Sequence, residues 1–212
     1  MKLNLILVAA VMLLSGCVTG TRSIDLGPPA YQGDKKSSGS VYIGSITDSR
    51  AFEAKPASPS TPSVDGDLSK TPKEKLNSLI GRQRNGYGKA MGDVALPAGV
   101  TVQNEMRDLL TAGLQARGYT VTQDKNAPVT MSVDIEKFWA WFSPGVWAVS
   151  FESNLQCKIN VSNKGKTKEL NVVGYGLNKG QVASDANWSL TYQRAFEDFL
   201  KNFDKALDDA GL

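Results

Sequence analysis

The sequence predicts an α+β fold: a two-layer sandwich in which a mostly antiparallel sheet carries two amphipathic helices on one face. Two stretches, 101–117 and 184–210, repeat their apolar residues with the 3.6-residue period of a helix that buries one side. Between them, 129–177 alternates apolar and polar residues in three successive segments, which is typical of strands in a sheet with one wet face. The apolar stripes of the helices can cover the one apolar face of this sheet.

Both helices have recognisable ends. Gly118 and Gly211 each follow the last turn, where a residue in the left-handed conformation is favoured. Ser184 or Asp185 can cap the start of the second helix. The apolar stripe of that helix is largely aromatic and consists of Trp188, Tyr192, Ala195, Phe196, Phe199, Phe203, Ala206 and Leu207.

The remaining strands are shorter. Residues 40–47 predict a first strand and 119–122 a strand after the first helix, while 79–80 and 94–96 are short extended pieces. Together with the helices and the three-strand meander they predict one domain over 40–212.

Two other segments are predicted to lie outside the core. Residues 18–39 have no apolar period, so 17–39 is expected to be a lipidated cysteine followed by a flexible tether. Residues 54–72 combine prolines with serine, threonine, glycine and aspartate, and this composition predicts a disordered surface loop.

The first sixteen residues read as a signal peptide. Lys2 supplies a positive start, and the apolar run that follows is too short to span a bilayer as a helix. The motif Leu14-Ser15-Gly16-Cys17 resembles a bacterial lipobox. This resemblance implies that Cys17 carries acyl chains, palmitate among them, and becomes the first mature residue. Val18 follows Cys17, which by analogy with lipoprotein sorting implies the outer membrane, facing the periplasm.

Composition excludes several classes of function. The chain has no histidine, so no Ser-His-Asp triad, Cys-His dyad or histidine-ligated zinc can form. Its two cysteines, Cys17 and Cys157, are far apart, and Cys157 alternates inward as a small core residue. Lysine and arginine number 24 against 21 acidic residues, a net charge of +3 that does not indicate nucleic acid binding. No cofactor, metal or enzymatic activity is predicted.

The order of motifs resembles the YajG-like family of small bacterial outer-membrane lipoproteins. The residues that carry the resemblance are the lipobox, Asp48-Ser49-Arg50, Ile80-Gly81-Arg82 and the helix end Leu109–Val121, followed by a meander and a C-terminal amphipathic helix. The resemblance implies an envelope lipoprotein of this fold without established enzymatic activity, and it supplies no catalytic residues.

A glycine-rich loop over 82–93 is one candidate site. Arg82, Arg84 and Lys89 stand among glycines whose backbone amides can cradle an anion, which suggests contact with an anionic glycan or lipid headgroup. The alternative is a flexible solvated loop. Asp48 and Arg50, at the end of the first strand, are expected to form a local turn and ion pair.

An aromatic turn over 138–147 is the second candidate. In the alternating phase of the strand, Trp139 and Trp141 should face the helices, whereas Phe138 and Phe142 should be exposed. We therefore predict that Phe138, Phe142 and Trp147 contact a partner. The alternative is that these rings wedge against the second helix.

These observations predict a non-enzymatic outer-membrane lipoprotein, a periplasmic binding or structural module in envelope assembly or maintenance. Its expected partners are the membrane, through the lipid anchor, and a protein or an envelope glycan or lipid. Two alternatives remain open: an accessory lipoprotein for lipopolysaccharide or outer-membrane protein assembly, and a cell-wall hydrolase.

Overall fold

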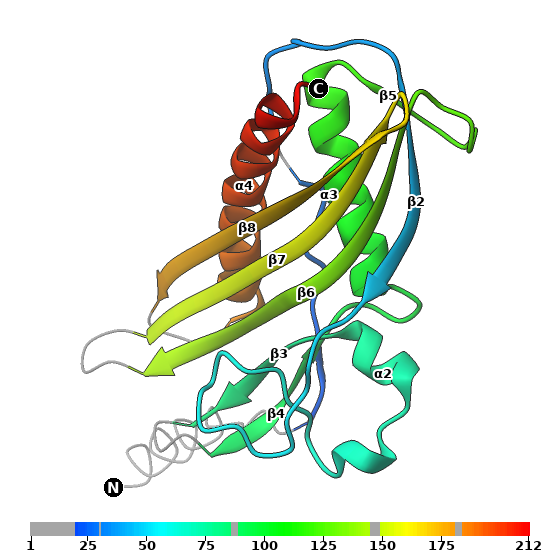
Figure 1. The fold of residues 1–212 in the computed structure, drawn as a ribbon. Coiled ribbons are helices and arrows are strands. Elements are labelled where there is room, and N and C mark those ends of the chain that lie inside the picture. The colour runs from blue at the N-terminus through cyan, green and yellow to red at the C-terminus, as the bar shows by residue number, and fades with distance from the viewer. Residues whose placement is uncertain (1–19, 30, 86–88, 145–148, 181–183) are drawn as a thin grey trace, which may run out of the picture.

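A computed structural model describes residues 20–29, 31–85, 89–144, 149–180 and 184–212. It confirms the α+β class, with helices packed on a curled, mixed, eight-stranded sheet (Figure 1). The elements in chain order are β1 (Arg22–Ser23), β2 (Ser40–Asp48), a 3-10 turn η2 (Leu68–Lys70), α2 (Lys73–Ser78), β3 (Leu79–Arg84), β4 (Ala90–Ala95), α3 (Val102–Arg117), β5 (Thr120–Thr122), β6 (Val129–Pro144), β7 (Val149–Asn163), β8 (Lys166–Gly180) and α4 (Asp185–Ala210).

Strand β6 is the centre of the sheet. One edge of β6 pairs along its length with β7, which in turn pairs with β8, and both ladders are antiparallel as predicted. Its other edge is shared: parallel β2 pairs with the first half of β6, and parallel β3 takes over at Ala140 and Trp141. Beyond β3 lie β4 and then the two-residue strand β1, while β5 pairs with β2.

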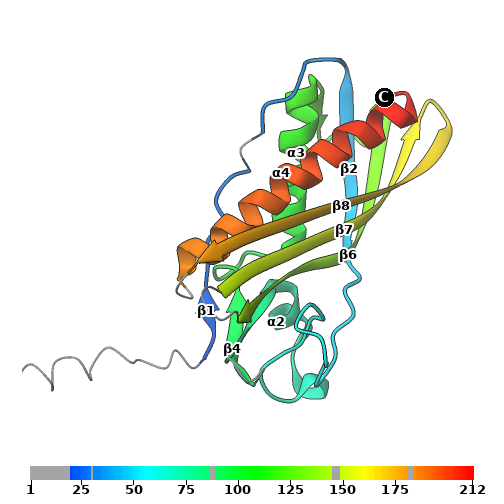
Figure 2. The same cartoon turned by 90° about the vertical axis from the view of Figure 1, so that its left-hand side faces the viewer.

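Helices α3 and α4 cover the same face of the sheet (Figure 2). Thr101 caps α3 in a capping box with Asn104, Ser184 caps α4, and Gly118 and Gly211 both adopt the predicted left-handed conformation. The inward side chains of β6 and β7 meet the aromatic stripe of α4, so the predicted shared core is confirmed.

Glycines on β8 let α4 lie directly against the strand. A side chain at Gly174 would come within 2.6 Å of the Phe199 Cβ atom, and one at Gly176 would overlap the Thr191 carbonyl oxygen. At this short separation, polar side chains of α4 bond the free edge of β8: Asp198 accepts from the Tyr175 amide, and Asn202 donates to the Val173 carbonyl. The edge of the sheet is thereby closed against pairing with another strand.

A β-bulge in β6 overturns the predicted faces of the aromatic turn. Ile135 pairs with Cys157 and Lys137 with Gln156, so Glu136 is an extra residue and the alternation shifts by one. Beyond Glu136 the inward residues are Phe138, Ala140 and Phe142, whereas Trp139 and Trp141 lie on the opposite face in a second cluster. The prediction that the two tryptophans pack on the helices is therefore wrong.

The segment between β2 and β3 covers these tryptophans, so the predicted disorder of 54–72 is also wrong. Val64 is 1% exposed in the cluster of Trp139 and Trp141, and Pro62 and Ser63 are buried beside it. The Trp139 indole donates to the Pro59 carbonyl at 3.2 Å. A proline-rich stretch becomes part of a core here because it shields apolar rings that the bulge turned outward.

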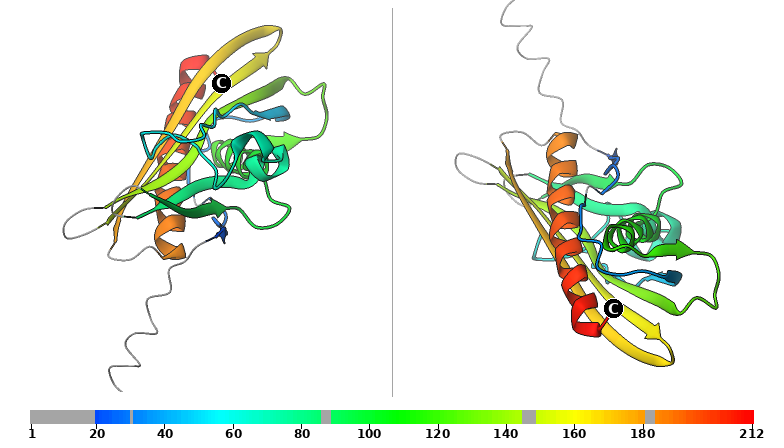
Figure 3. Two further views of the ribbon diagram at one scale, coloured as in Figure 1. Left: turned by 90° about the horizontal axis from the view of Figure 1, so that it is seen from below. Right: turned by 90° about the horizontal axis from the view of Figure 1, so that it is seen from above.

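The predicted tether is likewise a packed segment where the structure describes it. We call residues 20–39 the strap. Its start pairs with β4, and Ile24 and Leu26 are both 2% exposed. It then passes between α4 and α3 (Figure 3), where Ser189 donates to the Asp25 carbonyl and the Ser37 amide donates to the Arg117 carbonyl. The burial of Ile24 and Leu26, together with these two hydrogen bonds, holds the strap to the domain.

Candidate functional site

The predicted ion pair of Asp48 and Arg50 is confirmed, and it is more than a surface turn. Arg50 donates from Nε and Nη2 to the two oxygens of Asp48, each at 2.8 Å, and the side chains are 0% and 5% exposed. The same guanidinium donates to the carbonyl oxygens of Leu76, Leu79 and Phe138. Arg50 therefore joins α2, β3 and β6 at the point where β2 leaves the sheet, and its role is structural.

The predicted anion site is a hollow in the structure. Arg82, Arg84 and Lys89 line one cavity of about 440 Å³, together with Lys55 from the segment between β2 and β3. We call this cavity the basic hollow. Sequence reasoning missed Lys55, because it lies in a segment predicted to be disordered and far away in the chain.

Arg82 is not part of a flexible loop, contrary to the prediction. It belongs to β3, its side chain is 9% exposed, and its guanidinium donates to the Val64 carbonyl and to Asp65, the latter at 3.0 Å. Its Nε atom is buried and has no hydrogen-bond partner among the residues that the structure describes. Arg82 thus forms a fixed, charged wall of the basic hollow.

The other cations lie at the open side of the basic hollow. Burial and the nearby charge of Arg82 lower the pKa of Arg84, so positive charge is crowded at this point. Lys55 and Lys89 are exposed, and in the described part of the chain neither lies within 4 Å of a carboxylate. An anion could therefore contact several cations at once.

The N-terminal end of the strap lies beside the basic hollow. β1 runs parallel to β4 with Arg22 opposite Val94, and a side chain on Gly92 would overlap the Gly20 carbonyl oxygen. Gln83 pairs with Gly92, and Arg84 pairs with Ala90. The chain before β1 therefore reaches the domain at the end of β4 that borders the cations.

The predicted exposed aromatic pair does not exist. Phe138 is 0% exposed and stacks on Tyr192 with ring centroids 5.2 Å apart. Phe142 is half-buried, with its ring edge-on to Trp188 at 6.4 Å. Both rings belong to the core under α4, as the alternative prediction stated. Phe138 and Phe142 are therefore not part of an exposed contact site. Trp147 lies outside the described residues.

An acidic hollow separates the strap from α3. Asp25, Glu105 and Asp108 are among the residues that line a cavity of about 460 Å³. Burial raises the pKa of Glu105 to about 7, and the charges of Asp108 and Asp25 contribute. Glu105 can therefore hold a proton near neutral pH, which makes the seam between strap and helix sensitive to pH.

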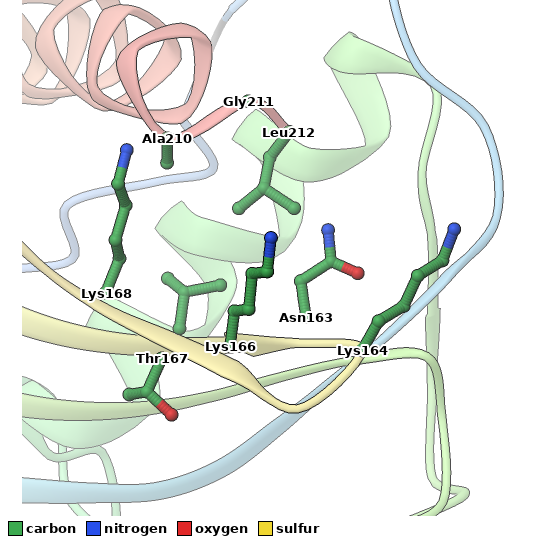
Figure 4. A pocket seen from close by; sticks show the side chains of 9 residues that line it. Asn163, Lys164, Lys166, Thr167, Lys168, Ala210, Gly211 and Leu212 are labelled. Carbon is green, nitrogen blue, oxygen red and sulfur yellow. The ribbon is translucent and has the colours of Figure 1, made fainter.

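A third concavity lies at the opposite end of the molecule, where the inner face of the sheet runs past the end of α4. We call it the distal hollow (Figure 4); it is about 700 Å³ and is lined by Val161, Asn163, Lys164, Lys166, Thr167, Lys168, Ala210, Gly211 and Leu212. Lys168 donates to the Asp209 carbonyl at 2.7 Å, whereas Lys164 and Lys166 form no ion pair with a described residue. Lys164, Lys166 and Lys168 alternate in the sequence, and this pattern is the signal that could have predicted the cationic rim.

The described residues contain no cluster of metal ligands. No group of three carboxylate, cysteine or histidine side chains among them could hold a metal ion. Cys157 is fully buried, and burial raises the pKa of its thiol, so it is an inert core residue as predicted. In the same parts of the chain, no helix has the length and apolar character needed to cross a bilayer.

The fold and these concavities define a class: an α+β domain that carries its N-terminal segment as a strap and presents cationic hollows at both ends. A family model described as "uncharacterized lipoprotein" matches residues 83–201, more than half of the chain. The chain belongs to this lipoprotein family. Membership indicates a membrane-anchored protein of the cell envelope.

One solved structure with low sequence identity shares the fold of this chain. Protein XCC0632 from Xanthomonas campestris has 6% identity and a TM-score of 0.51, over 91% of this chain and 99% of that one. Lipoprotein GNA1162 from Neisseria meningitidis has 9% identity and a TM-score of 0.24, over 81% and 96% of the two chains. The hypothetical protein CT253 from Chlamydia trachomatis has 11% identity and a TM-score of 0.28, over 81% and 98%. No curated protein matches the sequence.

Proposed function

We propose that this chain is a non-enzymatic lipoprotein of the outer membrane, acylated at Cys17 and facing the periplasm, that acts as a binding or structural module in envelope assembly or maintenance. Family membership supports the lipoprotein class. The lipobox Leu14-Ser15-Gly16-Cys17 names the residue that would carry the anchor. Two or three acyl chains on one residue anchor a protein far more firmly than the marginal binding of one chain.

The observation that carries the proposal furthest is the packing of the strap. Gly20 already lies against Gly92, and Ile24 is buried in the core. Only Val18 and Thr19 separate Gly20 from Cys17, and three residue steps extend at most about 11 Å. A lipid on Cys17 would therefore hold the domain at the membrane surface, with the basic hollow near the headgroups.

Fractionation tests the anchor. Cys17→Ser should leave the outer-membrane fraction or remain uncleaved, whereas Cys157→Ala removes the other cysteine and should stay with the membrane. A Cys17→Ser protein that is cleaved normally and still sediments with the outer membrane would contradict the proposal.

The distal hollow favours one second candidate, an accessory lipoprotein for lipopolysaccharide or outer-membrane protein assembly. Its walls combine the apolar side chains of Val161 and Leu212 with the cations Lys164 and Lys166, which suits a molecule with an apolar part and an anionic group. Native mass spectrometry of the lipidated protein would detect such an amphiphile. A Lys164→Glu/Lys166→Glu variant that retains the same ligand would count against this hollow as its site.

A further inference from the structure

We propose that the basic hollow binds the phosphate of an anionic phospholipid headgroup in the membrane that holds the lipid anchor. The inference rests on the proposed function, because it requires an acylated Cys17. It assigns that site a ligand class and gives the domain a fixed orientation on the membrane.

The basic hollow lies close to the point where the strap joins the domain. The strap approaches the domain parallel to β4, and going back from Ser23 to Gly20 it runs toward the end of β4 that begins at Ala90. Two residues of strand, about 7 Å, separate Gly92 from Ala90. A lipidated Cys17, at most about 11 Å from Gly20, would thus bring the membrane surface close to Arg84 and Lys89. Attraction to anionic lipids acts over about one Debye length, about 8 Å in physiological salt, and this short tether allows the cations to come that close to the headgroups.

The guanidinium of Arg82 lies in the wall of the basic hollow beside three further cations. The Arg82 side chain is more than nine-tenths buried, and among the described residues its Nε atom has no hydrogen-bond partner. A charged group that is buried and incompletely hydrogen-bonded is unfavourable, and an anion in the adjoining hollow would stabilise it. Asp65 bonds the other edge of this guanidinium but is itself 57% exposed, so its charge is partly screened by water.

The lining of the basic hollow suits a phospholipid headgroup. The four cations come from separate segments: Lys55 from the cover over the tryptophans, Arg82 and Arg84 from β3, and Lys89 from the start of β4. Pro56, Val64 and Ala90 line the same cavity. A phosphodiester with a glycerol backbone is complementary to this lining, because it carries a diffuse negative charge beside apolar carbon atoms.

The distal hollow supplies a matched comparison. Lys164 and Lys166 are exposed like Lys55 and Lys89. They lie at the turn between β7 and β8, which is at the far end of the molecule from β1 and β4 (Figure 2). A non-specific attraction of lysines to anionic vesicles would affect both ends. A headgroup site at the anchored end would affect only Lys55 and Lys89.

The experiment measures lysine acylation on the full lipidated protein, reconstituted into vesicles of phosphatidylcholine alone or mixed with phosphatidylglycerol. The protein is exposed briefly to an amine-acylating reagent. Mass spectrometry then measures the extent of acylation at Lys55, Lys89, Lys164 and Lys166. We expect Lys55 and Lys89 to react about fivefold more slowly on the anionic vesicles, the factor expected for a cation held at an anionic surface. Lys164 and Lys166 should react equally on both.

Variants then test the site itself. Arg84→Gln combined with Lys89→Gln should abolish the protection of Lys55, whereas Lys164→Gln combined with Lys166→Gln should preserve it. Equal protection of Lys55 on both kinds of vesicle would overturn the inference, because nearness to the membrane alone would then explain it. If dissolved glycerol phosphate protects Lys55 equally well on neutral vesicles, the hollow binds free phosphate instead of lipid. That result would also overturn the inference.

The two proposals fail in distinguishable ways. A protein that does not float with vesicles of either composition contradicts the anchor, and the headgroup inference falls with it. A protein that floats with both but shows no difference at Lys55 contradicts the headgroup inference alone.

Discussion

Arg50 provides the most direct test of how the fold is held together. Replacing it with methionine keeps an unbranched apolar stem but removes the bidentate bond to Asp48 and the bonds to three carbonyl oxygens. Asp48, which is 5% exposed, would then be a buried carboxylate without its counter-ion. Removing one partner of a buried pair costs about 3–5 kcal/mol, a large share of the 5–15 kcal/mol typical of a domain.

Equilibrium unfolding in urea, followed by tryptophan fluorescence, measures this cost. With a slope of about 2 kcal/mol per molar urea, Arg50→Met should lower the midpoint by about 1.5–2.5 M. The matched control is Lys70→Met. Lys70 also pairs with an aspartate, Asp67 at 3.4 Å, but both side chains are exposed, so the midpoint should fall by less than about 0.5 M.

A shift for Arg50→Met no larger than for Lys70→Met would refute the reasoning, since it would show that the buried guanidinium contributes no more than a surface charge. If Arg50→Met does not fold, Arg50→Lys keeps the charge and loses the planar fork. That variant should fold with an intermediate midpoint.

Three further outcomes follow from the packing. Because the pKa of Glu105 is raised, its protonated form stabilises the fold below about pH 5, and this stabilisation is lost as pH rises through about 7. In thermal unfolding, the free energy of unfolding of Glu105→Gln relative to the wild type should therefore increase by about 1 kcal/mol between pH 5 and pH 8. Gly176→Ala should lower the melting temperature, by the equivalent of at least about 1–3 kcal/mol, because the new side chain meets the α4 backbone; Lys179→Ala on the exposed face of β8 should not. Phe138→Ala should cost about 3–5 kcal/mol in urea unfolding because the ring is buried against Tyr192; a variant with wild-type stability would restore Phe138 as a surface contact.

Local patterns predicted the regular elements well, because the signals are contained within each element. The 3.6-residue stripe of α4, the caps Thr101 and Ser184, and the left-handed glycines after both helices act over a few neighbouring residues. The alternation in β7 is unbroken, so the inward position of Cys157 could be read directly.

The candidate site was only partly predictable. Arg82, Arg84 and Lys89 are close in the chain, and the structure brings all three to one cavity. Lys55 joins them across the fold, and no pattern in a proline-rich stretch announces such a contact. The aromatic contact site failed for a single reason: Glu136 is an extra residue in β6, and a bulge leaves no mark in the alternation that precedes it.

The sequence by itself determined the composition limits, the α+β class, the two helices and the three-strand meander, and it supplied the lipobox and the family resemblance. Tertiary structure decided which face each residue beyond the bulge occupies, since a strand pattern defines two faces but not which one the core takes. It also decided that the strap and the segment covering Trp139 and Trp141 are ordered. Neither segment has a periodic pattern of its own; each is held by apolar surfaces and hydrogen-bonding groups that exist only after distant strands and helices have come together.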